Sequence, residues 1–149
     1  MKKSTFLPKI IILYFFITAS FAIEQQNFLS KGIELYNKKQ FKESKILFEK
    51  SLVFNPKSEQ SYLYLAKIFS QNGTDDQQEI NLNNVLLLDP QNDEALYMLI
   101  LLKVEQSDYN LSRELIDRFN LVCKSFCSKK KELSKAFKKI TPNNEKSNN

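Results

Sequence analysis

A 34-residue repeat constrains the fold of this chain more than any other feature of its sequence. Pro56 and Pro90 lie 34 residues apart, and a polar residue, Asn55 or Asp89, precedes each of them. Upstream positions repeat at the same offset, as in Phe28 and Tyr62, Gly32 and Ala66, Leu35 and Phe69, Phe48 and Leu82, Leu52 and Leu86, and Phe54 and Leu88. A fixed period of this length is typical of stacked repeats, which commonly present a binding surface.

A third copy of the repeat follows the second. Its apolar positions are Leu96, Leu99, Tyr109, Ile116, Phe119 and Val122. Each copy has two apolar stripes at helical spacing, and the first two copies end at a proline, which stops a helix. In the second copy Gly73 ends the first stripe, and residues 74–77 are interpreted as a capping box. The pattern predicts a series of short antiparallel helices.

These helix pairs resemble tetratricopeptide repeats over residues 25–124. Residues that match the motif are the small Gly32 and Ala66, the aromatic Phe41 and Tyr109 at the start of the second helix, the apolar Phe48, Leu82 and Ile116, and the closing Pro56 and Pro90. Residues that depart from it are Ser44, Gln78 and Ser112 in place of alanine, Asp75 in place of the aromatic residue, Ile100 in place of the small residue and Lys124 in place of proline.

The resemblance implies an all-α fold, a right-handed solenoid of about three helix-turn-helix units within residues 23–124. The expected repeats are 25–58, 59–92 and 93–124. In this family the first helices line the concave surface, and the groove residues carried over by position are Leu29, Ile33, Tyr36, Asn37, Leu63, Lys67, Gln71, Tyr97 and Leu101. Tyr36 and Tyr97 are the expected anchors, because tyrosine combines a large contact area with a polar group.

Residues 125–140 are expected to form a basic amphipathic helix after the repeats. Apolar residues from Phe126 to Ile140 follow helical spacing, and the other faces carry Lys129, Lys130, Lys131, Lys135, Lys138 and Lys139. A stack of repeats needs a terminal helix with a polar outer face, so a cap is expected. The alternative is a basic helix that contacts anionic lipid or an acidic partner. The polar segment 141–149 is expected to be disordered.

The first 22 residues have the pattern of a signal peptide. Lys2, Lys3 and Lys9 precede an apolar run, and Ser20-Phe21-Ala22 predicts cleavage before Ile23. The alternative is an uncleaved anchor, although the run is about half the ~20 residues that a spanning helix needs. The composition is typical of an AT-rich bacterial genome, so we expect export to the periplasm, with secretion or anchoring as alternatives.

The charge of the chain is unevenly distributed. Residues 23–123 carry 11 basic and 15 acidic side chains, whereas residues 124–149 carry eight lysines and two glutamates. The repeats are therefore mildly acidic, which argues against nucleic acid as a partner. A protein or peptide partner is expected, with membrane contact secondary and self-association open.

Neither a catalytic site nor a metal site is expected. The chain has no histidine and no glycine-rich phosphate loop, so an enzyme and a cofactor are both disfavoured. Its two cysteines, Cys123 and Cys127, would need a turn between them to form a disulfide, and a reduced pair stays open. The expected function is that of a non-catalytic exported adaptor in envelope assembly, secretion or cell division. The alternatives are a peripheral membrane protein acting through its basic helix and a self-associating structural protein.

Overall fold

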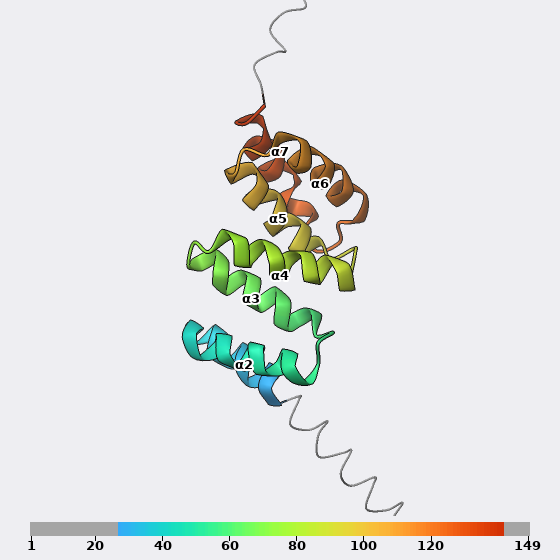
Figure 1. Ribbon diagram of the computed structural model, residues 1–149. Helices are drawn as coiled ribbons and strands as arrows, with labels where there is room; N and C mark the ends of the chain where they lie inside the picture. The colour runs from blue at the N-terminus through green and yellow to red at the C-terminus, as the bar shows by residue number, and fades with distance from the viewer. Residues whose placement is uncertain (1–26, 142–149) are drawn as a thin grey trace, which may run out of the picture. The chain divides into compact units, whose positions relative to one another are not determined.

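The computed structural model describes residues 27–141, and the regular secondary structure in that range is helical (Figure 1). The chain divides into two compact units, one ending at Tyr64 and the other beginning at Leu65, so that the boundary falls inside helix α3 (Glu59–Gln71). The predicted signal peptide, residues 1–22, lies outside the described residues, as does the predicted tail except for its first residue.

The first unit contains a helical hairpin and the beginning of α3. Residues 27–37 form the first helix of the hairpin, and α2 (Phe41–Phe54) forms the second. Phe48 is fully buried, and a β-carbon added to Gly32 would lie only 2.8 Å from its ring, which explains the glycine. Ser44 donates a hydrogen bond of 2.8 Å from its Oγ to the carbonyl of Gly32 and so joins the two helices.

Three buried serines connect the end of α2 to the start of α3. The Oγ atoms of Ser58 and Ser61 lie 2.8 Å apart, and Ser61 Oγ donates to Ser51 Oγ at 3.0 Å. In the second repeat, Val85 and Ala95 occupy the positions equivalent to Ser51 and Ser61, and both are fully buried. The same place in the repeat is therefore filled by hydrogen-bonded hydroxyl groups in one copy and by apolar packing in the next.

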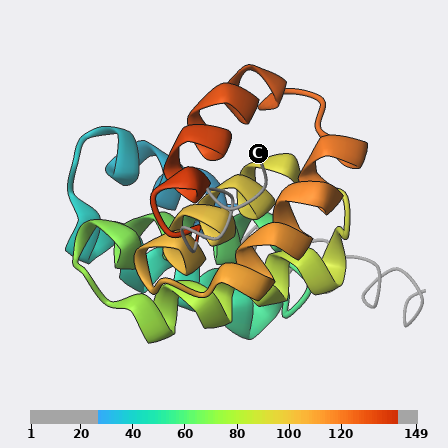
Figure 2. The same ribbon diagram turned by 90° about the horizontal axis from the view of Figure 1, so that it is seen from above.

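The second unit continues from α3 into three further helices. These are α4 (Asp75–Leu88) and α5 (Asp93–Glu105), which pack together, and α6 (Tyr109–Val122), which packs on α5. A short 3-10 turn, η1 (Cys127–Lys129), leads into α7 (Lys130–Lys138), which lies against α5 and α6 (Figure 2). The most deeply buried apolar residues of this unit include Leu82, Val85, Leu96, Ile100, Phe119 and Leu133.

The turn between the two helices of each repeat has the same backbone geometry in all three copies. Lys39, Gly73 and Ser107 are 34 residues apart, and their φ angles are 60°, 64° and 58°. The next amide of each turn donates back to the preceding helix, in Gln40 to Leu35 at 2.9 Å, Thr74 to Phe69 at 3.0 Å and Asp108 to Lys103 at 2.9 Å. This is a C-terminal helix cap, in which glycine is the residue favoured at the left-handed position.

Side-chain caps begin some of the helices but not α4. Asn92 Oδ1 accepts from the amide of Ala95 at 2.8 Å, and Asp108 Oδ1 accepts from that of Leu111 at 3.1 Å. Thr74 is the N-cap of α4, yet its side chain makes no capping hydrogen bond, so the capping box expected at 74–77 is wrong. Acidic residues in the first turn still stabilise the positive end of α4.

The C-terminal helix is shorter than the expected range of 125–140. Residues 124–126 form a bend, and the α-helix begins at Lys130, after η1. Phe126 therefore lies before the helix rather than on its apolar stripe. Leu133 is 1% exposed and does lie on the buried side of α7.

The repeated turn predicts that glycine stabilises the two copies that lack it. Lys39→Gly and Ser107→Gly are each expected to raise the free energy of unfolding by about 0.5–1 kcal/mol, because they remove the strain of a side chain at positive φ. Urea unfolding measures the change. The control is Asn110→Gly, at an exposed helical position in α6, which is expected to destabilise the protein by about 0.3 kcal/mol, because glycine is a slightly poorer helix former than asparagine. A loss of stability in Ser107→Gly similar to that in Asn110→Gly would contradict this interpretation.

Candidate functional site

The residues expected to line the groove are divided between the two units. In the first unit, the half-buried residues are Leu29, Ile33 and Tyr36. Asn37 is exposed, and Leu63 is buried. The ring of Tyr36 packs edge-on against Phe41 and Tyr64, with centroids 5.3 and 5.0 Å away. Leu63 is only 8% exposed, so it acts as a core residue and offers little surface to a partner.

The groove residues of the second unit have four different environments. Gln71 is exposed, and Lys67 is half-buried with its Nζ 2.8 Å from a carboxylate oxygen of Glu94. Leu101 is half-buried and lines a cavity. Tyr97 is half-buried and contacts the segment that follows α6.

Tyr97 holds the C-terminal segment against α5. Its hydroxyl donates to Glu132 of α7 at 2.6 Å, its ring lies 5.6 Å from that of Phe126, and Lys129 Nζ lies 5.4 Å from the ring centroid. Burial, together with the hydrogen bond to Glu132, raises the pKa of Tyr97 above its ordinary value. The hydrogen bonds from Tyr97 and Lys129 lower the pKa of Glu132. These contacts engage the ring and the hydroxyl of Tyr97 within the chain itself, and its expected role as a groove anchor stays a prediction.

Cys123 and Cys127 form a disulfide, with their Cα atoms 5.2 Å apart. The helix α6 ends at Val122, and a bend separates the two cysteines, which is the turn that such a bridge requires. Both cysteines of the chain are thereby paired. Among residues 27–141, no group of three or more histidine, cysteine, aspartate or glutamate residues is placed to hold a metal ion.

Asp93, the first residue of α5, binds the backbone of the disulfide loop. Its Oδ2 accepts from the amide of Lys124 at 2.6 Å and from that of Phe126 at 2.8 Å. Burial alone would raise the pKa of the Asp93 carboxyl, but hydrogen bonds from the amides of Phe126, Lys124 and Ser125 outweigh it and lower the pKa below its ordinary value. The carboxylate therefore fixes the loop to the start of α5.

A cavity of about 220 Å³ lies in the second unit, between the end of α3, the start of α4 and α5. Its lining combines polar and apolar side chains, including Asp75, Gln78, Met98, Leu101, Leu102 and Glu105. Gln78 is only 6% exposed, and its amide makes no hydrogen bond to the residues that the structure describes. The Gln78 side chain lines the cavity, so a ligand group that enters the cavity can bond to its amide.

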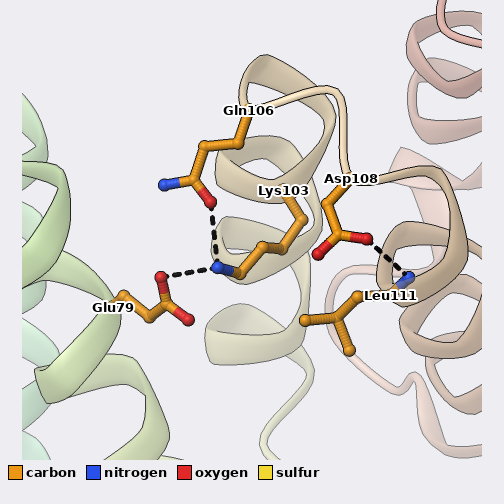
Figure 3. Close-up of polar contacts among 5 residues, drawn as sticks. All are labelled: Glu79, Lys103, Gln106, Asp108 and Leu111. Carbon is orange, nitrogen blue, oxygen red and sulfur yellow. Dashed lines mark hydrogen bonds and ion pairs between the residues drawn. The ribbon is translucent and has the colours of Figure 1, made fainter.

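A buried lysine connects α4 to α5 in the same unit (Figure 3). Lys103 is 7% exposed, and its Nζ donates to Glu79 Oε2 at 2.5 Å and to Gln106 Oε1 at 2.9 Å. Lys103 stands where the earlier copies have Leu35 and Phe69. The nearby carboxylate compensates the buried charge, so this lysine already has its acidic partner.

The lysines of the expected basic patch differ in their surroundings. Four are exposed without a described contact, Lys131, Lys135, Lys138 and Lys139. Lys130 is exposed and donates to the carbonyl of Asn120 at 3.3 Å, and Lys129 is engaged with Tyr97 and Glu132. Across residues 27–141 no helix has both the length and the apolarity needed to cross a bilayer.

Reasoning from the sequence missed the residues that attach the C-terminal segment. In the sequence Asp93 is one of several acidic residues at expected helix starts, where the helix dipole accounts for them, and helical spacing placed Phe126 on an apolar stripe. Contacts between residues more than 30 positions apart leave no periodic signal. The sequence did contain an indication of the cavity, because two of the residues that line it, Asp75 and Gln78, depart from the repeat motif.

The fold of this chain is shared with known structures. No protein-family model matches the sequence, and no curated protein matches it. The structure of the tetratricopeptide-repeat domain of Sgt2 from Aspergillus fumigatus aligns with a TM-score of 0.67 at 18% identity, over 85% of each chain. This chain has the tetratricopeptide-repeat fold.

A second tetratricopeptide-repeat match comes from a bacterium. PilF of Pseudomonas aeruginosa aligns with a TM-score of 0.63 at 13% identity and covers 81% of this chain, which spans 54% of that protein. The all-α class inferred from the 34-residue period is confirmed. At these identities the similarity establishes the tetratricopeptide-repeat fold alone.

Asp93→Asn is expected to reduce the free energy of unfolding by about 1 kcal/mol at pH 7, because it removes a charge-assisted hydrogen-bond acceptor at a partly exposed site. The folded-state pKa of Asp93 is lowered, so its stabilisation is present above the unfolded pKa, near 3.9, and is lost as the pH falls through the folded pKa. Urea unfolding should therefore show a difference from wild type that disappears in acid. Asp117→Asn, on the exposed surface of α6, serves as the control. An equal difference at pH 7 and at low pH would contradict the assigned role.

Proposed function

We propose that this protein is a non-catalytic exported adaptor that binds a protein or peptide partner through the first helices of its repeats. The cavity beside α5 carries this proposal, because it offers apolar contact surface together with the side-chain amide of Gln78, which makes no hydrogen bond to the described residues. Tetratricopeptide-type stacks commonly bind partners on their concave surfaces. Envelope assembly, secretion or cell division in a bacterium is the proposed setting, by analogy with other proteins of this fold.

Two observations support export. The sequence of residues 1–22 has the charged start, apolar run and small residues of a cleavable signal. The disulfide between Cys123 and Cys127 is of a kind that persists in oxidising compartments and is rare in the cytosol. The proposed location is the bacterial periplasm, with Ile23 as the first residue of the mature chain.

Self-association is a second candidate, favoured by a repeated apolar position. Val53, Leu87 and Leu121 are 34 residues apart near the ends of α2, α4 and α6, and they are 77%, 79% and 87% exposed. A second copy of the chain could bury these exposed apolar side chains. Membrane contact through α7 receives less support, since Leu133 is buried and the exposed lysines could act only by charge.

Site-specific photo-crosslinking in the organism that makes the protein tests the adaptor proposal. A photoreactive residue is placed at Gln71 or Glu105, near the proposed contact surface, and at Asn83 on α4 as an exposed control. We expect one specific partner to be captured from the first two positions and not from Asn83. Mass spectrometry of this chain, isolated from the same cells, is expected to find Ile23 at its amino terminus.

Two results would contradict the adaptor proposal. The first is the same set of captured proteins from Asn83 as from Gln71 and Glu105. The second is a crosslink that joins only copies of this chain, captured from a photoreactive residue at Leu121, which would favour self-association instead.

A further inference from the structure

The first residue of the second helix differs in the middle repeat. Phe41 begins α2 and Tyr109 begins α6, and both rings are packed: Phe41 lies 5.3 Å from the ring of Tyr36, and Tyr109 stacks at 5.0 Å on Phe137 of the following helix. The equivalent residue in α4 is Asp75, which has a small charged side chain. The middle repeat therefore lacks the aromatic ring that fills this position in the other two.

The cavity lies where that ring is missing. Asp75 itself lines it, and the remaining space of about 220 Å³ extends to α5, the helix that follows. A cavity that holds one water molecule has a volume of only ~10–15 Å³ on the same measure. The cavity here is many times larger, so it can hold a side chain. The substitution of an aromatic residue by aspartate explains both its position and its acidic character.

The lining has a charge and a shape that favour a cationic group on an apolar stem. Asp75 and Glu105 contribute carboxylates, and neither has an ion-pair partner among the described residues. Gln78 contributes a side-chain carbonyl that accepts no hydrogen bond from any residue in the range 27–141. Met98, Leu101 and Leu102 supply apolar surface. A negatively charged ligand would face two carboxylates here, so anions are disfavoured.

We propose that this cavity binds the side chain of an arginine carried by the protein or peptide partner, an inference that rests on the proposed adaptor function. A guanidinium group has five donors in a planar arrangement, which suits two carboxylates and an amide carbonyl better than the compact ammonium group of lysine. The methylene groups of arginine would cover the apolar lining. The amide nitrogen of Gln78 would remain free to donate to a backbone carbonyl of the partner.

Nuclear magnetic resonance of the ¹⁵N-labelled protein tests the proposal at the residue concerned. The probe is N-acetyl-L-arginine N′-methylamide, a blocked arginine that mimics the residue within a chain. It is expected to shift the side-chain amide signals of Gln78 in a saturable manner. The corresponding blocked citrulline, which has nearly the same shape without the charge, is expected to leave those signals unchanged.

Variants and related probes make the test specific. Asp75→Asn/Glu105→Gln is expected to weaken binding of the blocked arginine by roughly tenfold or more, because two charged acceptors are lost. Glu114→Gln/Asp117→Asn, which removes two exposed charges on α6 outside the cavity, is expected to bind as wild type does. Equal binding by blocked citrulline, equal binding by blocked lysine, or unchanged binding in the cavity variant would each overturn the proposal.

Free L-arginine distinguishes a partner residue from a small-molecule ligand. A site for an arginine within a chain is expected to bind the blocked form at least as tightly as the free amino acid, and tighter binding of free arginine would overturn the assignment to a partner. The proposal and the adaptor function can fail separately. A partner captured equally well by wild type and by Asp75→Asn/Glu105→Gln would leave the adaptor function standing and refute the arginine site.

Discussion

The left-handed turn within each repeat is the constraint on which the rest of the structure depends. It reverses the chain at Lys39, Gly73 and Ser107 with nearly the same φ angle, and it fixes where the next helix begins. The residue two positions later opens the second helix: it is Phe41 in α2, whose ring packs against Tyr36, and Asp75 in α4, which lines the cavity. Because the backbone repeats so closely, a change of side chain at this position changes the space that is filled.

Residues at the start of α5 attach the disulfide loop and α7 to that helix. Asp93 accepts two amides of the disulfide loop, and Tyr97, one turn further along α5, bonds to Glu132 of α7. The same face of α5 that was expected to bind a partner is therefore partly covered by the chain itself. The uncovered part lies further along α5, where Leu101 and Glu105 border the cavity.

The sequence predicted the elements that arise from local periodicity and failed where distant contacts decide. The starts of α2 and α6 follow from Phe41 and Tyr109, and the ends of α2 and α4 follow from the prolines that stop them. The positive φ at Lys39 and Ser107 could not be seen, because neither residue signals a left-handed turn. Tyr97 and Leu63 were assigned to the groove from repeat position alone, which carries no information on what covers a side chain.

The central claim is that aspartate at position 75 leaves unfilled a space that an aromatic ring fills in the neighbouring repeats. The most direct measurement is the free energy of unfolding of Asp75→Tyr beside that of Asp76→Tyr, since both variants remove one carboxylate from the first turn of α4 and only the first places a ring at the cavity. The account predicts that Asp75→Tyr is more stable than Asp76→Tyr by about 1 kcal/mol or more, from the apolar area that the ring buries. Equal stability of the two variants, or lower stability of Asp75→Tyr, would contradict it.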